Sequence, residues 1–397
     1  MSDAPTAATP AASPAEPPAY AGPPLRLARV ELREIRLPLV EPFRISSGVC
    51  TERRILLLTL HDAAGVTGWS ECVAGEQPNY SAETIDTAWW AIREWLAPRL
   101  LGAPIADPTA VRARLREGVV GHPMAKAALE MGLWDVAARL AGLPLARLLG
   151  GTRDRVAVGI SLGIQDSPDA LGDRVRRARV EGYARVKVKI KPGADVDHVA
   201  AARAALGPGV PLSADANSAY TLAHAEHLAR LDAFDLAMLE QPLGEDDLVR
   251  HAVLQRRLRT PICLDESITD VERCEDALTL ASARVVNIKP GRVGGFTASR
   301  RIHDVCAAHG VPVWCGGMLE SGVGRAHNVA LASLPGFTKP GDLSPSARYW
   351  ARDVVTPEWT MDDGLVTVPL DRPGLGVTVD VDRIDDLTVR TSVLEAR

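Results

Sequence analysis

Charged residues recur at nearly equal intervals through the middle of the chain, each within or directly after a short apolar run. They are Lys189, Asp215, Glu240, Asp265 and Lys289, separated by 26, 25, 25 and 24 residues. A single such residue is more typical of a loop anchor or a solvated charge, because charged side chains are rarely buried unpaired. The common spacing indicates instead that each occupies the same position in one of several consecutive units.

The three acids, Asp215, Glu240 and Asp265, predict a metal site. Carboxylates brought together without a neutralising partner repel one another, and a hard divalent cation removes that repulsion. Three monodentate carboxylate oxygens leave three of the six positions around an octahedral ion for substrate and water. This pattern favours Mg²⁺, or Mn²⁺ and similar divalent cations, as the cofactor.

Three lysines near the acids are candidates for proton transfer: Lys187, Lys189 and Lys289. A lysine acts as a base near neutral pH only if its pKa falls well below the ordinary value of about 10.4. A nearby divalent cation and the ammonium group of Lys187 both favour a lower pKa for Lys189. Two lysines on strands that flank the acids would face each other across a bound substrate.

Seven apolar runs recur through this part of the chain, five of them carrying these charges, and each is followed by a stretch of helical composition. The runs start about 25 residues apart, the length of one strand–helix unit with short loops. They are 156–164, 184–190, 211–217, 236–242, 261–267, 285–290 and 311–317, with a weaker candidate at 337–343. Seven or eight such units favour a (β/α)8 barrel, with charges at the C-terminal strand ends pointing into its mouth. An open doubly wound sheet is the alternative, although no glycine-rich phosphate loop follows the first run.

The remaining segments divide the chain into further parts. Residues 1–24 are rich in Ala and Pro and are expected to form a disordered tail. Residues 25–150 have strand texture followed by helical texture, which predicts an α+β domain. The barrel is expected over 151–349, and the segment 350–397 returns to strand texture and is expected to complete the first domain.

Composition excludes several classes of protein. The 397 residues include 45 basic and 50 acidic side chains, a net charge of -5, which argues against a nucleic-acid partner. No apolar run approaches the roughly 18 residues of a membrane span. The six cysteines have no CxxC spacing, so reduced thiols in a cytoplasmic protein are the simplest interpretation.

Several motifs around the charged residues are similar to those of the enolase superfamily. They are "YARVKVKI", "ADANSAY", "LEQPL", "CLDES", "NIKPGRVGG" and "CGGMLESGVGRAHN". More narrowly, the chain resembles the branch of o-succinylbenzoate synthases and N-acylamino acid (N-succinylamino acid) racemases. The last motif and the following "PGDLSPSARYW" are the most specific to this branch, and the resemblance covers nearly the whole chain after the tail.

The resemblance implies a fold and a set of roles. The fold is an α+β capping domain on a modified (β/α)8 TIM-type barrel, with the C-terminal segment returning to the cap. The implied metal ligands are the three acids, and Lys189 and Lys289 are the implied acid/base pair. Lys187 would assist the enolate oxygen or lower the pKa of its neighbour, and Ser161 and Asn217 would be polar groups of the site. Members of this family usually form homo-oligomers.

The substrate pocket is expected beneath two cap loops, 41–48 and 68–80. Phe43 is a candidate apolar wall, although a core position is equally consistent with the sequence. Met318, Leu319 and Glu320 follow the last clear strand and are candidates for the acyl pocket, Glu320 because a charge there needs a partner. Arg292 could tune Lys289, but an exposed arginine after a turn is the default interpretation.

The expected chemistry is removal of a proton α to a carboxylate through an enediolate. The resemblance implies an o-succinylbenzoate synthase (a dehydratase of menaquinone biosynthesis), an N-acylamino acid racemase, or both, acting on a small-molecule carboxylate. A muconate cycloisomerase or a dipeptide epimerase is the alternative, although "GGMLES" differs from the aspartate-rich motif usual in the epimerases. A barrel that only binds a metal or an acyl ligand is a third possibility, which the intact lysine pair opposes.

Overall fold

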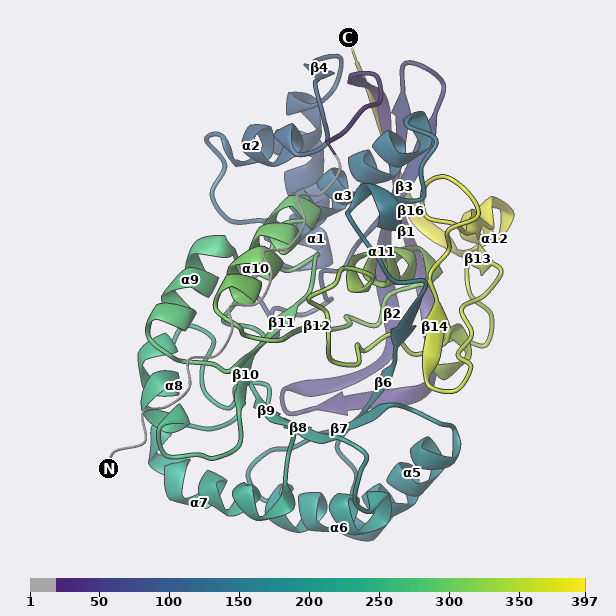
Figure 1. Cartoon of the computed structure of the whole chain (residues 1–397). Helices are drawn as coiled ribbons and strands as arrows, with labels where there is room; N and C mark the ends of the chain where they lie inside the picture. The colour runs from purple at the N-terminus through teal and green to yellow at the C-terminus, as the bar shows by residue number, and fades with distance from the viewer. Residues whose placement is uncertain (1–18, 397) are drawn as a thin grey trace.

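Residues 19–396 are described by a computed structural model (Figure 1). Most of the tail predicted at 1–24 therefore lies outside the described residues. The described chain forms an antiparallel sheet with its own helices, here called the cap, and a curved parallel sheet surrounded by helices. No helix of the described part is both long and apolar enough to cross a membrane.

The cap is built on an antiparallel sheet with the strand order β16-β1-β2-β3, and a short β4 pairs with β1. These strands are β1 (Leu25–Ile45), β2 (Gly48–Asp62), β3 (Thr67–Cys72), β4 (Pro104–Ile105) and β16 (Thr388–Glu395). Its helices are α1 (Ile85–Ala91), α2 (Ala110–Arg116) and α3 (Pro123–Leu140). Helix α3 is buried along almost its whole length because it packs between this sheet and the helices of the parallel sheet.

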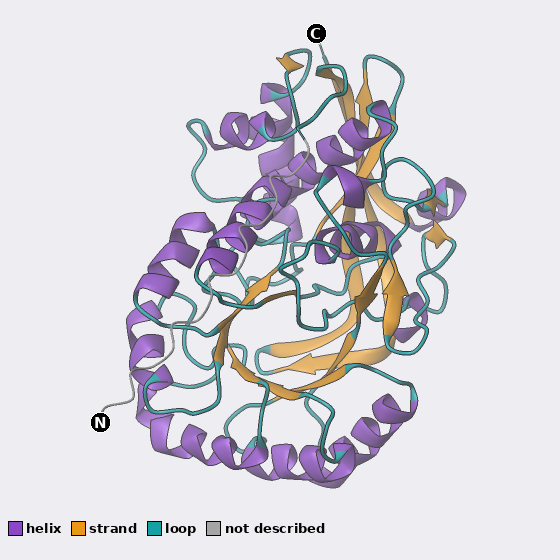
Figure 2. Ribbon diagram, in the orientation of Figure 1, coloured by secondary structure: helices purple, strands orange, loops and turns teal. Residues whose placement is uncertain are grey.

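The second part is a seven-stranded parallel sheet in the order β12-β11-β10-β9-β8-β7-β6. Its strands are β6 (Gly159–Leu162), β7 (Arg185–Lys189), β8 (Leu212–Asp215), β9 (Met238–Glu240), β10 (Ile262–Leu264), β11 (Val285–Ile288) and β12 (Val313–Cys315). Figure 2 shows the helices around the outer side of this curved sheet. The predicted modified barrel with a cap is therefore confirmed, and the open doubly wound sheet is excluded.

A helix follows each strand of the parallel sheet along the chain, as the spacing predicts. They are α5 (Pro168–Val180), α6 (Val196–Leu206), α7 (Ala225–Ala229), α8 (Leu248–Gln255), α9 (Val271–Thr279), α10 (Phe296–Ala308) and α11 (Gly322–Ala332). Side chains of Ser167, Asp195, Asp247, Asp270 and Ser321 accept hydrogen bonds at the starts of five of these helices. Such caps satisfy backbone N–H groups that a helix start leaves free, so they fix where each helix begins.

The weaker strand candidate at 337–343 fills the eighth position without forming a regular strand. Phe337 makes a parallel bridge to Val313 of β12, and Gly341 makes one to Val158, just before β6. The segment therefore lies between β12 and β6, the two edge strands of the parallel sheet, and covers part of both edges.

The C-terminal segment contacts both parts of the molecule. Strand β14 (Leu365–Thr367) pairs with β5 (Arg155–Ala157), and β13 (Val355–Thr356) pairs with β15 (Thr378–Val379). After α12 (Val381–Leu387), β16 pairs with β1 of the cap. The chain thus returns to the cap as expected, while the exact limits of the three parts stay a prediction.

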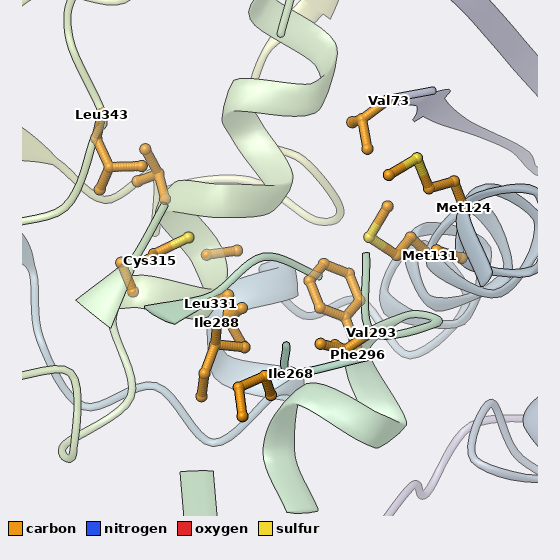
Figure 3. Packing of buried hydrophobic residues seen from close by; sticks show 14 of the residues in the cluster. Val73, Met124, Met131, Ile268, Ile288, Val293, Phe296, Cys315, Leu331 and Leu343 are labelled. Carbon is orange, nitrogen blue, oxygen red and sulfur yellow. The ribbon is translucent and has the colours of Figure 1, made fainter. Parts of the chain in front are cut away.

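Buried carboxylates attach the cap to the starts of two barrel helices. Glu130 of α3 accepts hydrogen bonds from the backbone N–H groups of Phe296 and Thr297 at the start of α10. Glu71 of β3 accepts one hydrogen bond from the backbone N–H and one from the side-chain hydroxyl of Ser321 at the start of α11. Helix starts favour negative charge, so these contacts hold the cap against the helices that follow β11 and β12. Figure 3 shows the apolar side chains packed at this junction, with residues of α3 beside Phe296.

Candidate active site

The parallel register brings the charged strand ends together. Lys189 of β7 is opposite Asp215 of β8, and Asp215 is opposite Glu240 of β9. Asp265 directly follows β10, and Lys289 directly follows β11. All five side chains are buried, with at most 9% of the residue exposed. The structure therefore gathers at one end of the sheet the residues that the sequence spacing selects.

Lys189 is bound to residues of the next strand and its loop. Its Nζ atom lies 2.7 Å from Asp215 Oδ2 and 2.7 Å from Asn217 Oδ1. Asn217 in turn donates a 2.9 Å hydrogen bond to Glu266 Oε1. Asn217 adopts a left-handed backbone conformation, with φ of 41°. Asparagine tolerates this conformation better than other residues except glycine, and the two hydrogen bonds hold Asn217 beside the lysine.

Lys187 is surrounded by carboxylates. Its Nζ atom lies 2.8 Å from Glu240 Oε2, 2.8 Å from Asp342 Oδ2 and 3.2 Å from Asp215 Oδ2. Burial alone would lower the pKa of Lys187, but Asp342, Glu240 and Asp215 outweigh it and raise that pKa above its ordinary value. Lys187 therefore remains a cation next to Lys189.

Lys289 is held by Asp265 and by the cap. Its Nζ atom lies 2.8 Å from Asp265 Oδ2 and 3.0 Å from the hydroxyl of Tyr80. Burial opposes the charged form of Lys289, but Tyr80, Glu266 and Glu240 raise its pKa overall. This direction is opposite to the lowering that the lysine-base prediction requires, because acidic groups here surround the ammonium group.

Two residues, Arg292 and Tyr80, contact Asp265 in ways that the sequence analysis does not predict. The guanidinium group of Arg292 contacts Asp265 Oδ1 and the Tyr80 hydroxyl. Arg292 is only 2% exposed, so the default interpretation of an exposed arginine is wrong. The position of Arg292 inside the "NIKPGRVGG" motif was the available signal, and Tyr80 is the last residue of the cap loop 68–80 expected over the pocket, although it was not singled out.

A third missed group supports Lys187. Asp342 is buried, and its Oδ1 atom accepts a 2.6 Å hydrogen bond from Arg185 of β7. The guanidinium of Arg185 and the ammonium of Lys187 both lie over the Trp314 ring, at 4.2 and 4.7 Å from its centroid. Asp342 belongs to the "PGDLSPSARYW" motif, so the motif was recognised while the contribution of its acid was not.

A cavity of about 350 Å³ opens beside the two outer lysines. Both cap and barrel line it, and its lining includes Lys189, Lys289, Asn217, Tyr80, Phe43, Met318 and Leu319. Met318 also contacts Lys289, with its sulfur 3.6 Å from Nζ. Larger hollows elsewhere, of about 560 to 700 Å³, are lined by none of the strand-end charges. The cavity of 350 Å³ is therefore the candidate substrate site.

Two predicted pocket residues lie differently. Glu320 accepts hydrogen bonds from the Met318 backbone and from Asn328, and it pairs with Arg325 at 3.2 Å. It supports the Met318 loop rather than the cavity surface. Ser161 is buried on β6 opposite Lys187, and its hydroxyl has no hydrogen-bond partner among the described residues. Substrate contact by either residue stays a prediction.

The acids suit a divalent cation by chemistry and strand position. Asp215, Glu240 and Asp265 supply hard carboxylate oxygens, which Mg²⁺ prefers. Glu266 Oε2 is a further buried oxygen without a hydrogen-bond partner in the described chain. In this structure the acids are turned toward ammonium and guanidinium groups, and no three acidic, histidine or cysteine side chains of residues 19–396 form a metal-binding cluster. The three acids are therefore suitable ligands for such an ion, although in this structure their oxygens form ion pairs with basic side chains.

Comparison with known families accounts for both parts of the molecule. Residues 28–150 match the mandelate racemase / muconate lactonizing enzyme N-terminal domain. Residues 170–383, more than half of the chain, match the enolase C-terminal domain-like family. With the capped parallel sheet and its strand-end charges, these matches show that the chain belongs to the enolase superfamily.

Relatives place the chain more narrowly. It is 48% identical over 364 residues to an o-succinylbenzoate synthase of Geobacillus kaustophilus, covering 92% of this chain and 96% of that protein. It is 49% identical over 365 residues to an N-succinylamino acid racemase of an Amycolatopsis species, covering 92% and 98%. Within the superfamily, the chain therefore belongs to the branch that contains these two kinds of enzyme.

Solved structures agree with this placement. An enolase-superfamily member from Listeria innocua has a TM-score of 0.90 and 39% identity. The match covers 94% of this chain and 100% of that one. A dipeptide epimerase from Cytophaga hutchinsonii, complexed with Mg and the dipeptide D-Ala-L-Val, has a TM-score of 0.84 and 25% identity, covering 93% and 100%. The latter is a more distant relative in which a metal and a small carboxylate ligand are present together.

Proposed function

We propose that this chain is an enzyme that removes a proton α to a carboxylate, with o-succinylbenzoate synthase and N-succinylamino acid racemase activities. The observation that carries the proposal is the entry of Lys189 and Lys289 into one cavity, with three acidic strand ends between them. Relatives 48% and 49% identical support the same two activities. The apolar Met318 and Leu319 in the lining favour them over a dipeptide epimerase, whose ligand carries an ammonium group.

Asp215, Glu240 and Asp265 would hold the divalent cation, with Mg²⁺ as the preferred ion. When bound, such a cation offsets the charge of the three acids and the negative charge that develops on the substrate carboxylate. Asn217 and Asp342 then keep contacts with Lys189 and Lys187 respectively. These contacts preserve the lysine positions while the acids change partners.

The two outer lysines exchange protons with the substrate. In racemisation, one lysine removes the α-proton from one face, and the other returns a proton to the opposite face. In dehydration, Lys189 removes the α-proton and passes it to the departing hydroxide, which leaves as water. Lys289 stays an ammonium group and stabilises the enediolate in that reaction. Lys187 supplies a fixed positive charge beside Lys189 in both.

The experiment that tests the proposal is a comparison of kcat/KM for the o-succinylbenzoate precursor and for N-succinyl amino acids. Both substrates are offered to the same preparation with Mg²⁺, and dehydration and loss of optical activity are followed. We expect turnover of both, because the same residues serve both reactions. Turnover of neither substrate would overturn the proposal.

The remaining predictions concern partners and location. Six free cysteines, five of them buried, support the cytoplasmic setting expected from the sequence. The partner we propose is a small-molecule carboxylate. Homo-oligomer formation stays a prediction, to be checked by light scattering.

A further inference from the structure

Arg53 is a buried arginine in the cap wall of the substrate cavity. It lies on β2 and is 7% exposed, and it belongs to the cavity lining. Leu57 of β2 pairs with Glu71 of β3, and Arg53 is four residues from Leu57, so alternation places it on the same sheet face as Glu71. Glu71 binds the start of the barrel helix α11. Arg53 therefore projects from the sheet face that is turned toward the barrel.

The guanidinium group of Arg53 has few partners. Its Nη2 atom lies 3.4 Å from the backbone oxygen of Val73 and 3.5 Å from that of Ala74, both long for hydrogen bonds. Its Nε atom is buried and has no hydrogen-bond partner among residues 19–396. No carboxylate of that range lies within 4.0 Å of it, and its charge acts on Glu71 only from beyond that distance. A buried guanidinium group with free donors is costly unless an anion binds it.

The neighbouring arginines and acids already form ion pairs or hydrogen bonds with other residues. Arg54 is bound to Glu34 at 2.7 Å, and Arg36 is bound to Glu52 at 2.8 Å. Glu71 uses its oxygens on α11. Of the charged side chains on this stretch of the hairpin, Arg53 is the one that faces the cavity without a counter-ion. Glu76 also lines the cavity, but it is exposed and forms no ion pair with Arg53.

We infer that Arg53 binds the distal carboxylate of the substrate's succinyl group, and so selects dicarboxylate substrates. This inference rests on the proposed function. The reacting carboxylate belongs beside Lys189 and Lys289 at the barrel strand ends, whereas Arg53 lies in the cap wall of the same cavity. A substrate with a second carboxylate on its acyl arm would span from one to the other. The planar guanidinium group can bind that carboxylate with two parallel hydrogen bonds.

The test compares N-succinyl-phenylalanine with N-acetyl-phenylalanine as racemisation substrates for the wild type and for Arg53→Gln. The acetyl compound keeps the reacting carboxylate and lacks the distal one. We expect Arg53→Gln to lose roughly tenfold to a hundredfold in kcat/KM for the succinyl substrate, mainly through KM. Activity on the acetyl substrate should stay within about twofold of wild type, because the contacts of the reacting carboxylate with the barrel do not involve Arg53.

Two further variants complete the design. Arg33→Gln removes a positive charge from the same hairpin; neither Arg33 nor its partners Glu31 and Asp385 line the cavity, so it should change neither substrate's kinetics. Arg53→Lys keeps the charge but loses the two-pronged geometry, and it should give a smaller selective loss. If Arg53→Gln fails to fold, as judged by its Tm, the Lys variant decides the question by the same comparison of substrates.

Competitive inhibition gives a binding readout that is independent of turnover. N-succinylglycine should inhibit the wild type more strongly than N-acetylglycine, and Arg53→Gln should remove that difference. Equal loss of affinity for both compounds, or no loss for either, would overturn the inference while leaving the proposed function intact. A wild type that turns over neither acyl amino acid nor the o-succinylbenzoate precursor would instead overturn the proposed function itself.

Discussion

Lys189 and Lys289 reach the same cavity from strands β7 and β11, and each ammonium group is bound by a different carboxylate. Asp215 holds the first at 2.7 Å, and Asp265 holds the second at 2.8 Å. Tyr80 of the cap and Asn217 of the barrel provide one further contact each. The two lysines thus have separate sets of partners. Either lysine can therefore be replaced without removing the contacts that hold the other.

Replacement of Lys289 by alanine should abolish racemisation, because one face of the substrate would lose its proton donor. General acid/base groups contribute on the order of a hundred- to ten-thousandfold to the rate. Polarimetry measures the loss, and exchange of the α-proton with deuterium in one enantiomer should persist through Lys189. Lys191→Ala, at an exposed lysine after β7, is the matched control. Near-normal racemase activity of Lys289→Ala would reject its role.

Chelation should remove both activities, and added Mg²⁺ should restore them. The three acids would lose the ion that offsets their charge and that of the substrate carboxylate. The measurement is initial rate after dialysis against a chelator, before and after titration with Mg²⁺ or Mn²⁺. Full turnover in excess chelator would contradict the predicted metal site.

A methyl group added at Gly316 should displace Lys289. A Cβ atom there would lie 2.6 Å from Asn287 Nδ2 and 2.7 Å from Lys289 Cε, both far closer than normal contacts. A displacement of about 1 Å at a reacting group costs roughly a hundredfold in rate. We therefore expect Gly316→Ala to lower kcat, and also to lower Tm because the added methyl group overpacks a buried site. Gly244→Ala, where nothing lies within 4 Å of an added Cβ, is the control. Wild-type kcat in Gly316→Ala would show that the lysine tolerates the shift.

Glu71 should make stability depend on pH. Burial raises its pKa from 4.5 to about 8, an effect that its bond from Ser321 only partly offsets. A carboxyl group whose pKa is raised on folding binds more protons in the folded state, so its contribution to the free energy of unfolding falls as pH rises from about 4.5 to about 8. The fall is of the order of a few kcal/mol.

Urea unfolding of the wild type and Glu71→Gln across that range isolates this contribution. The difference in free energy of unfolding between the two proteins should decrease with rising pH, because the glutamine variant has no proton to lose. A difference that is constant with pH would show that Glu71 stays ionised at the junction of cap and barrel.

Sequence spacing predicted the part of the site that depends on strand register. Lys189, Asp215 and Glu240 fall at matching positions because consecutive parallel strands align their ends, and such regularity is visible along one chain. Tyr80 and Arg292 could not be found in this way. Their contact with each other joins segments 212 residues apart, and only the packing of cap on barrel brings them together.

The same reason explains where the pocket prediction was incomplete. Phe43, Met318 and Leu319 were ambiguous between core and cavity because an apolar residue at a loop is compatible with both. Glu320 attracted attention as a charge needing a partner, and Arg325, five residues further on, supplies it at 3.2 Å. The sequence does not show which side chains of a loop point into the cavity and which point into the protein core.

The β1–β2 hairpin contributes Phe43 and Arg53 to a cavity whose two lysines, Lys189 and Lys289, come from the strand ends of the parallel sheet. One wall of the cavity and the lysines that transfer the proton therefore come from different segments of the chain. A substitution in the hairpin would therefore change the shape and charge of that wall while Lys189 and Lys289 keep their positions.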